Sequence, residues 1–156
     1  MSYAFDNSPL STLFRNFYRS RFPTLWQKFD ELIADGGLLS TREVMREIED
    51  GPVESLRTWA TRNDKIFATP TAEEGVFIAK IFAIEHFQQN IELQKILKGG
   101  RNADPFIIAR AAIAGCPLVT MEQLKPNAAK IPNICKHFNI ECLSLEEFME
   151  REGWQF

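Results

Sequence analysis

YAFDNSP, at residues 3–9, joins a short apolar run that stops at Asp6 to the turn-forming residues Asn7, Ser8 and proline. A second short apolar run, Leu38-Leu39, follows a helical pattern, and the chain continues to alternate short apolar runs with helical patterns. Strands that alternate with helices are typical of a parallel sheet covered by helices. We therefore expect an α/β fold, a three-layer α/β/α sandwich whose mainly parallel central sheet has about four to five strands.

The length and composition indicate one ordinary globular domain. The chain has 156 residues, of which 45% are hydrophobic and 25% charged, and a net charge of −3. These values predict a single domain over residues 1–156 and exclude nucleic-acid binding by overall charge alone, but not a local basic strip. No apolar run reaches the roughly 18 residues of a membrane span, and the start MSYAFDN lacks a signal segment. A cytoplasmic protein without a membrane segment is expected.

Several short patterns predict local structure. Asp104 before Pro105 is typical of a helix N-cap, and Gly115 is expected to end that helix. Three cysteines without a C-x-x-C spacing are predicted to be buried thiols. A Ser or Thr with Glu three residues later predicts a capping box, and this spacing occurs at Ser40–Glu43, Thr71–Glu74 and Ser144–Glu147.

Four acidic residues are expected to share one edge of the sheet. Asp6 and Glu122 follow predicted strand ends, whereas Glu47 and Asp104 are expected in first turns of helices that leave the same edge. Ligands of open parallel sheets bind outside the carboxyl ends of the strands. Clustered carboxylates repel one another unless cations lie between them, and oxygen ligands suit Mg²⁺ or Mn²⁺. Capping at Asp104 and solvation at Glu47 are the simpler alternatives.

Four segments resemble the motifs of one family. They are residues 3–8, with Asp6 at a strand end; residues 38–48, with Glu47 on a helix; residues 103–109, with Asp104 opening an apolar helix; and residues 119–122, with Glu122 where most of the family has Asp. The sequence resembles the PIN-domain family, the fold of the ribonuclease toxins of the virulence-associated protein C type. Within that family it is most similar to a branch of short PIN-like proteins largely without an assigned function. The resemblance covers nearly the whole chain.

The resemblance implies a site and an activity. Asp6, Glu47 and Asp104 would bind Mg²⁺ or Mn²⁺, Glu122 would be the fourth acid, and Thr120 would orient a ligand or water. The implied activity is endonucleolytic cleavage of single-stranded RNA by the toxin of a type II toxin–antitoxin pair. A cognate antitoxin protein and a homodimer are the implied partners.

Basic and polar residues near this site are candidates for binding the substrate. Residues 14–22 interleave three arginines with four aromatic residues, which could hold phosphates and stack on bases. The alternative is that these aromatic residues belong to the core. Lys95, Lys98 and Arg101 form a second basic group. The candidate substrate-binding residues are Asn7, Ser8, Arg15, Arg19, Arg21 and Arg101.

Two other function classes remain open at this point. One is a PIN-like module that binds RNA or a protein without cleaving anything, which the acidic overall charge and Glu122 favour. The other is a structure-specific DNase of the flap-nuclease type, which usually carries more acids than this chain offers.

Overall fold

The computed structural model describes residues 1–91 and 102–156. Its described strands form one parallel sheet in the order β3-β2-β1-β4-β5. The strands are β1 (Tyr3–Phe5), β2 (Leu38–Thr41), β3 (Phe67–Ala68), β4 (Leu118–Val119) and β5 (Cys142–Leu143). The predicted α/β fold with a parallel central sheet is confirmed.

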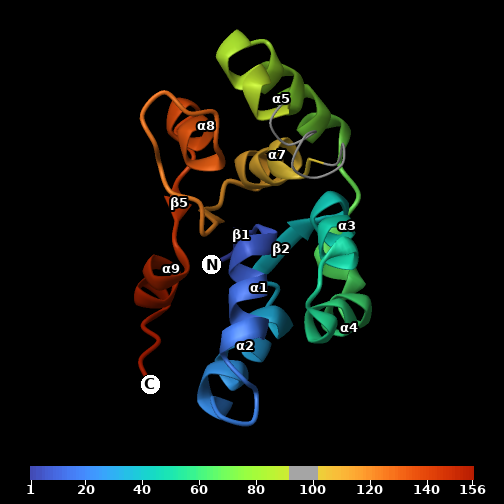
Figure 1. The fold of residues 1–156 in the computed structure, drawn as a ribbon, viewed down its shortest axis with the longest axis vertical. Coiled ribbons are helices and arrows are strands. Elements are labelled where there is room, and N and C mark those ends of the chain that lie inside the picture. Colours follow the sequence, from blue (N-terminus) through green and yellow to red (C-terminus); the bar gives the residue numbers. More distant parts are fainter. Residues whose placement is uncertain (92–101) are drawn as a thin grey trace.

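Helices cover both faces of this sheet, as a three-layer sandwich requires (Figure 1). In that view α5 (Ala72–Phe82), α7 (Asp104–Ala114) and α8 (Ile131–His137) lie above the sheet. Below it lie α1 (Asn7–Asn16), α2 (Pro23–Ala34), α4 (Glu54–Arg62) and α9 (Leu145–Glu152). The remaining described helices are α3 (Arg42–Asp50) and the 3₁₀ turns η1 (Asp64–Ile66) and η2 (Glu85–Phe87).

Strand β1 lies at the centre of the core. Tyr3, Ala4 and Phe5 are all fully buried, because helices cover the parallel sheet on both faces. Phe148 of α9 packs edge-on against two of these residues, with ring centroids 4.7 Å from Tyr3 and 5.1 Å from Phe5. The backbone that follows β1 is therefore held firmly in place.

The helix starts agree only in part with the sequence patterns. The capping boxes at Thr71 and Ser144 are confirmed. The box at Ser40 is wrong: Thr41 caps α3 by accepting a hydrogen bond from the Val44 amide at 3.3 Å, while Ser40 stays in β2 and donates to the Phe5 carbonyl at 2.9 Å. Pairing with β3 extends β2 two residues further than the expected Leu38-Leu39. Glu43 instead pairs with two exposed arginines, Arg42 and Arg46.

Two further expectations near the sheet edge change in the structure. Asn7-Ser8-Pro9 does not form a separate turn, because α1 begins at Asn7 directly after Asp6. Glu47 lies in the second turn of α3 and not in the first.

Cys116 and Cys135 are buried as expected, and Cys142 is half-buried. Across the described residues, no helix combines the length and the apolar character needed to cross a bilayer.

Candidate acidic site at the end of strand β1

The end of β1 lies at the point where the order in which the chain adds strands to the sheet reverses. After β1 the chain builds β2 and β3 on one side, and later β4 and β5 on the other side. Phe5 pairs with Val119, so that the residues that follow these two strands, Asp6 and Thr120, lie side by side. The Asp6 amide donates to the Val119 carbonyl at 3.0 Å. Crevices at such reversal points are the usual ligand sites of parallel sheets.

Two hydroxyl groups hold one oxygen of the Asp6 carboxylate. Thr120 Oγ1 donates to Asp6 Oδ2 at 3.0 Å, and Ser8 Oγ donates to the same oxygen at 3.2 Å. Asp6 is 6% exposed and Thr120 is 1% exposed. Within residues 1–91 and 102–156, no hydrogen bond reaches the other oxygen, Asp6 Oδ1. One edge of this carboxylate is fixed, and the other is available to a ligand.

Thr120 also connects this carboxylate to Glu122. Thr120 Oγ1 accepts a hydrogen bond from the Glu122 amide at 3.2 Å. The Glu122 side chain turns to α8, where its Oε2 accepts the Ile131 amide at 3.1 Å. Ile131 is the first residue of α8, and a carboxylate there satisfies a free amide and the positive end of the helix. Glu122 therefore has a structural contact of its own.

Asp104 reaches the same part of the molecule from α7. It is 1% exposed, and its Oδ2 accepts a hydrogen bond from Asn90 Nδ2 at 2.9 Å. Asn90 Nδ2 also donates to the Ala129 carbonyl, in the segment before α8, at 2.9 Å. Asp104 is not the N-cap that the sequence predicts: Ala103 holds that position, and the Asp104 side chain points to Asn90 instead of capping the helix.

The pKa of a buried thiol indicates that Asp104 and Glu122 lie near each other. Cys135 of α8 is fully buried, and its pKa is raised by a hydrogen bond with Cys142, by burial, and by the nearby carboxylates of Glu122 and Asp104. Both carboxylates must lie close to this thiol to act on it, because charge effects weaken with distance. Glu122 and Asp104 thus both lie near α8, and Asp6 is linked to Glu122 through Thr120.

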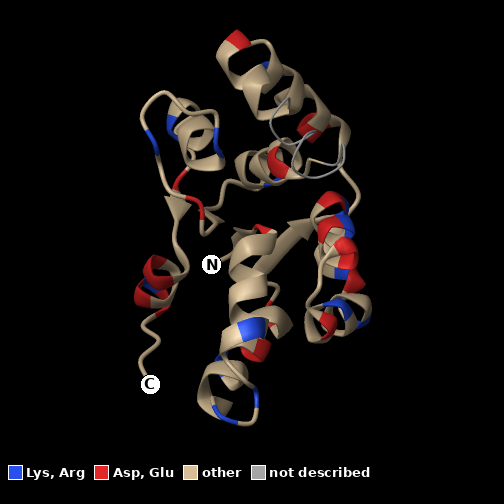
Figure 2. Cartoon of the chain, viewed as in Figure 1, with Lys and Arg blue, Asp and Glu red and all other residues tan. Residues whose placement is uncertain are grey.

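Glu47 lies on the opposite side of β1 from Glu122. It is half-buried on α3, which follows β2, whereas Thr120 and Glu122 follow β4 on the other side of β1. Helix α3 contacts α7. Figure 2 shows acidic and basic residues intermixed along α3 and few charges in the sheet. Among the residues that the structure describes, no three or more His, Cys, Asp or Glu side chains lie close enough together to hold a metal ion.

A family model fits nearly the whole chain. The model described as Domain of unknown function (DUF4411) matches residues 3–156. The chain belongs to the DUF4411 family. A search of curated proteins and a search of solved structures each found no match. The DUF4411 match includes all four acidic residues and Thr120.

The candidate substrate-binding arginines of this DUF4411 chain differ in their exposure and in their contacts. Arg15 and Arg21 are exposed, whereas Arg19 is held by Asp30 at 3.1 Å and stacks 4.3 Å above the ring of Trp26. Phe14 packs against Trp26 with ring centroids 4.8 Å apart, as the core alternative predicts. Arg101 lies outside the described residues, as do Lys95 and Lys98.

Asn7 and Ser8 are the remaining candidates, and they have separate contacts. Asn7 Oδ1 accepts a hydrogen bond from Ser11 Oγ at 3.0 Å within α1. Ser8 Oγ contacts Asp6, as described above, and accepts the Met121 amide at 3.0 Å. Ser8 therefore belongs to the acidic site, while Asn7 supports the first turn of α1.

Asn90 is the functional candidate of the DUF4411 chain that the sequence does not reveal. It is 4% exposed, donates to Asp104 and Ala129, and accepts a hydrogen bond from Asn102 Nδ2 at 2.7 Å. No motif surrounds it, and its partners are distant in the sequence. Only the packing of the segment after η2 against α7 and the loop before α8 places this amide at the site.

Proposed function

We propose that the protein is a metal-dependent endoribonuclease that hydrolyses phosphodiester bonds of single-stranded RNA. The observation that carries this proposal is the Asp6 carboxylate, nearly buried at the reversal point, with one oxygen held by two hydroxyl groups. A carboxylate fixed in this way is suited to place a cation or a cation-bound water. The resemblance to the PIN-domain family supplies the substrate class.

The side chains at this edge fit a hard cation. Asp6, Asp104, Glu122 and Glu47 offer only oxygen ligands, the kind that Mg²⁺ and Mn²⁺ prefer. Mg²⁺ usually keeps several waters and takes about one or two protein carboxylates, so a cluster of three close acids is not required. When bound, such a cation would activate a water and neutralise charge on the phosphate.

Each residue of the chain has a distinct part in this proposal. Asp6 presents its Oδ1 edge, while Thr120 and Ser8 prevent the carboxylate from rotating. Asn90 orients Asp104 toward the same region. Glu122 and Glu47 complete the acidic set from the two flanking sides, α8 and α3.

Cleavage of RNA tests the proposal directly. Purified protein should cut single-stranded RNA with Mg²⁺ or Mn²⁺ and not with EDTA. Asp6→Asn should lower the rate by about a hundredfold or more, because it removes the fixed charge without changing the size of the side chain. Asp35→Asn, at an exposed residue that follows α2, is the matched control and should cut normally. Cleavage that persists with EDTA and in Asp6→Asn would contradict the proposal.

A toxin of a type II toxin–antitoxin pair is the biological setting that we propose for this activity. The resemblance implies a cognate antitoxin and a homodimer, and a cytoplasmic location is the expectation drawn from the sequence. Expression should arrest growth, and the neighbouring small reading frame should restore it. Growth arrest that also occurs with Asp6→Asn would separate toxicity from cleavage and would contradict this setting.

A module that binds RNA or protein without cleavage is the second candidate. It is favoured by the hydrogen bonds of two acids, since Asp104 accepts from Asn90 and Glu122 caps α8. These contacts give both carboxylates a structural purpose without a metal. If the protein is such a module, RNA should stay intact under every metal condition. The folded protein should still bind a partner.

A further inference from the structure

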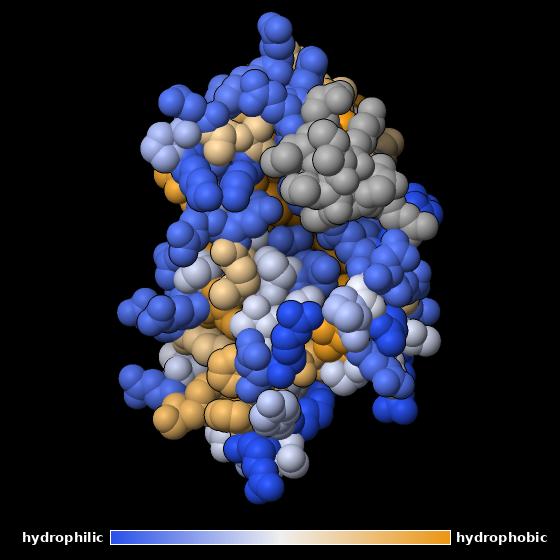
Figure 3. Space-filling view, in the orientation of Figure 1, coloured by the Kyte–Doolittle hydropathy of each residue, from blue (hydrophilic) through white to orange (hydrophobic). Residues whose placement is uncertain are grey.

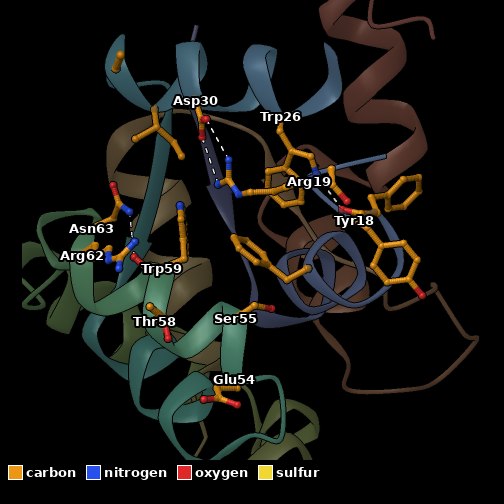
Figure 4. A pocket seen from close by; sticks show the side chains of 15 residues that line it. Tyr18, Arg19, Trp26, Asp30, Glu54, Ser55, Thr58, Trp59, Arg62 and Asn63 are labelled. Carbon is orange, nitrogen blue, oxygen red and sulfur yellow. Dashed lines mark hydrogen bonds and ion pairs between the residues drawn. The ribbon is translucent and has the colours of Figure 1, made fainter. Parts of the chain in front are cut away.

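A pocket of about 1180 Å³ lies between α1, α2 and α4, away from the acidic site (Figure 4). Phe14 from α1, Trp26 from α2 and Trp59 from α4 contribute aromatic rings to it. The rings of Phe14 and Trp59 are 5.2 Å apart at a tilt of 48°. The pocket exceeds the volume of one flat heterocycle. Trp26 is 3% exposed and Trp59 is 8% exposed, so only a small part of each ring faces the pocket.

One charged residue that lines this pocket, Arg19, is paired with a carboxylate. Arg19 forms hydrogen bonds with both oxygens of Asp30, at 3.1 and 3.4 Å. Its guanidinium stacks over the Trp26 ring, as Figure 4 shows, and this contact holds it flat. Arg19 and Asp30 therefore form a solvent-exposed ion pair that lines the pocket, and not a free positive charge.

The rim contributed by α4 is polar and carries one cation, Arg62, and one carboxylate, Glu54. Ser55, Thr58 and Asn63 line the pocket beside Arg62, and Figure 4 shows these side chains on α4 and at its end. Arg62 is exposed, and none of the ion pairs found among the described residues includes it. An aromatic interior next to an unpaired arginine is complementary to a base joined to a phosphate.

An exposed aromatic residue lies at the edge of the pocket. Tyr18 lines the pocket and is 63% exposed, so its ring is open to solvent. Figure 3 shows mainly polar residues in that view, with an apolar area at the lower left near the C-terminal segment. An exposed tyrosine beside a pocket is a common stacking platform for single-stranded nucleic acid.

We propose that this pocket binds one unpaired base of the RNA, with Arg62 holding the adjacent phosphate. The inference rests on the proposed ribonuclease function and names a second contact for the same substrate. Helix α1 connects the two places, since it begins beside Asp6 and ends next to the pocket residue Phe17. Its length of about 15 Å corresponds to a few nucleotides of extended single-stranded RNA.

Binding without a metal isolates this contact from cleavage. The probe is a six-nucleotide single-stranded RNA with 2′-O-methyl riboses, added in EDTA to the full chain. Two of the three tryptophans line the pocket, so the RNA should quench the tryptophan fluorescence. Tyr18→Ala and Arg62→Ala should each weaken binding about tenfold, the size typical of one stacked base or one phosphate contact. Both residues are exposed, so the variants should remain folded.

Matched variants and distinct outcomes complete the test. Phe156→Ala removes an aromatic side chain that is also 63% exposed but lies outside the pocket lining, and it should bind the RNA as the unchanged chain does. Equal affinity in all variants, or RNA that leaves the tryptophan emission unchanged, overturns the base-binding proposal even if Mn²⁺-dependent cleavage is found. Absence of cleavage together with the expected quenching would instead overturn the nuclease proposal alone.

Discussion

Thr120 is the residue that joins the parts of the acidic site. Its hydroxyl donates to Asp6 and accepts the Glu122 amide. Thr120→Val keeps the shape but removes both hydrogen bonds, so we expect the free energy of unfolding to fall by about 1–3 kcal/mol. RNA cleavage should fall further than stability explains, since Asp6 loses a restraint. Urea unfolding and cleavage assays measure the two effects. Thr120→Ser should restore most of both, and a valine variant as active as the unchanged chain would contradict the assignment.

Tyr3 makes stability depend on pH at alkaline values. Its hydroxyl donates to Glu152 Oε2 at 2.6 Å, and burial, this bond and the Glu152 charge raise its pKa above the ordinary value of about 10. A raised folded-state pKa stabilises the protein below the unfolded pKa, and the benefit is lost as pH rises above about 10. In urea unfolding from pH 8 to 11, the stability advantage over Tyr3→Phe should therefore shrink. Tyr18→Phe, at the exposed tyrosine, should show the same slope as the unchanged chain.

At the scale of elements, helix α8 depends on a loop carboxylate. Glu122 caps it through the Ile131 amide. Glu122→Ala should lower the free energy of unfolding by about 1 kcal/mol, and Glu122→Gln by less, because an amide oxygen can still accept the bond. If Glu122 also serves the cation, as we propose, Glu122→Gln should still lose cleavage. Normal cleavage by a well-folded Glu122→Gln would show that this residue only caps the helix.

At the scale of the whole molecule, a cation should stabilise the fold. Ligands that bind only the native state raise its stability by mass action. At a Mn²⁺ concentration about tenfold above the dissociation constant, we expect the melting temperature to rise by about 4 °C for a domain of this size. The measurement is thermal unfolding with Mn²⁺ and with EDTA. Asp6→Asn should abolish the rise, and an equal rise in that variant would indicate that Mn²⁺ binds elsewhere.

Most of the fold follows from local patterns in the sequence. The helix starts at Thr71 and Ser144 were predictable, because each side chain caps a helix only a few residues away. Strand β1 was predictable because a short apolar run buried on both faces has few alternatives in a parallel sheet. The position of Ser40 in a strand was not predictable. Its hydroxyl donates a hydrogen bond to the Phe5 carbonyl of another strand, and no local pattern in the sequence shows this partner.

In the candidate site, too, local sequence determines some features and tertiary packing determines the others. The sequence by itself determined that Asp6 ends a buried strand and that Asp104 begins an apolar helix, because strand and helix ends depend on adjacent residues. Only the tertiary structure decided what these carboxylates contact: hydroxyls of Ser8 and Thr120 for Asp6, and the Asn90 amide for Asp104. The physical reason is that hydrogen-bond partners in a buried crevice are chosen by how strands and helices pack, which depends on the whole core.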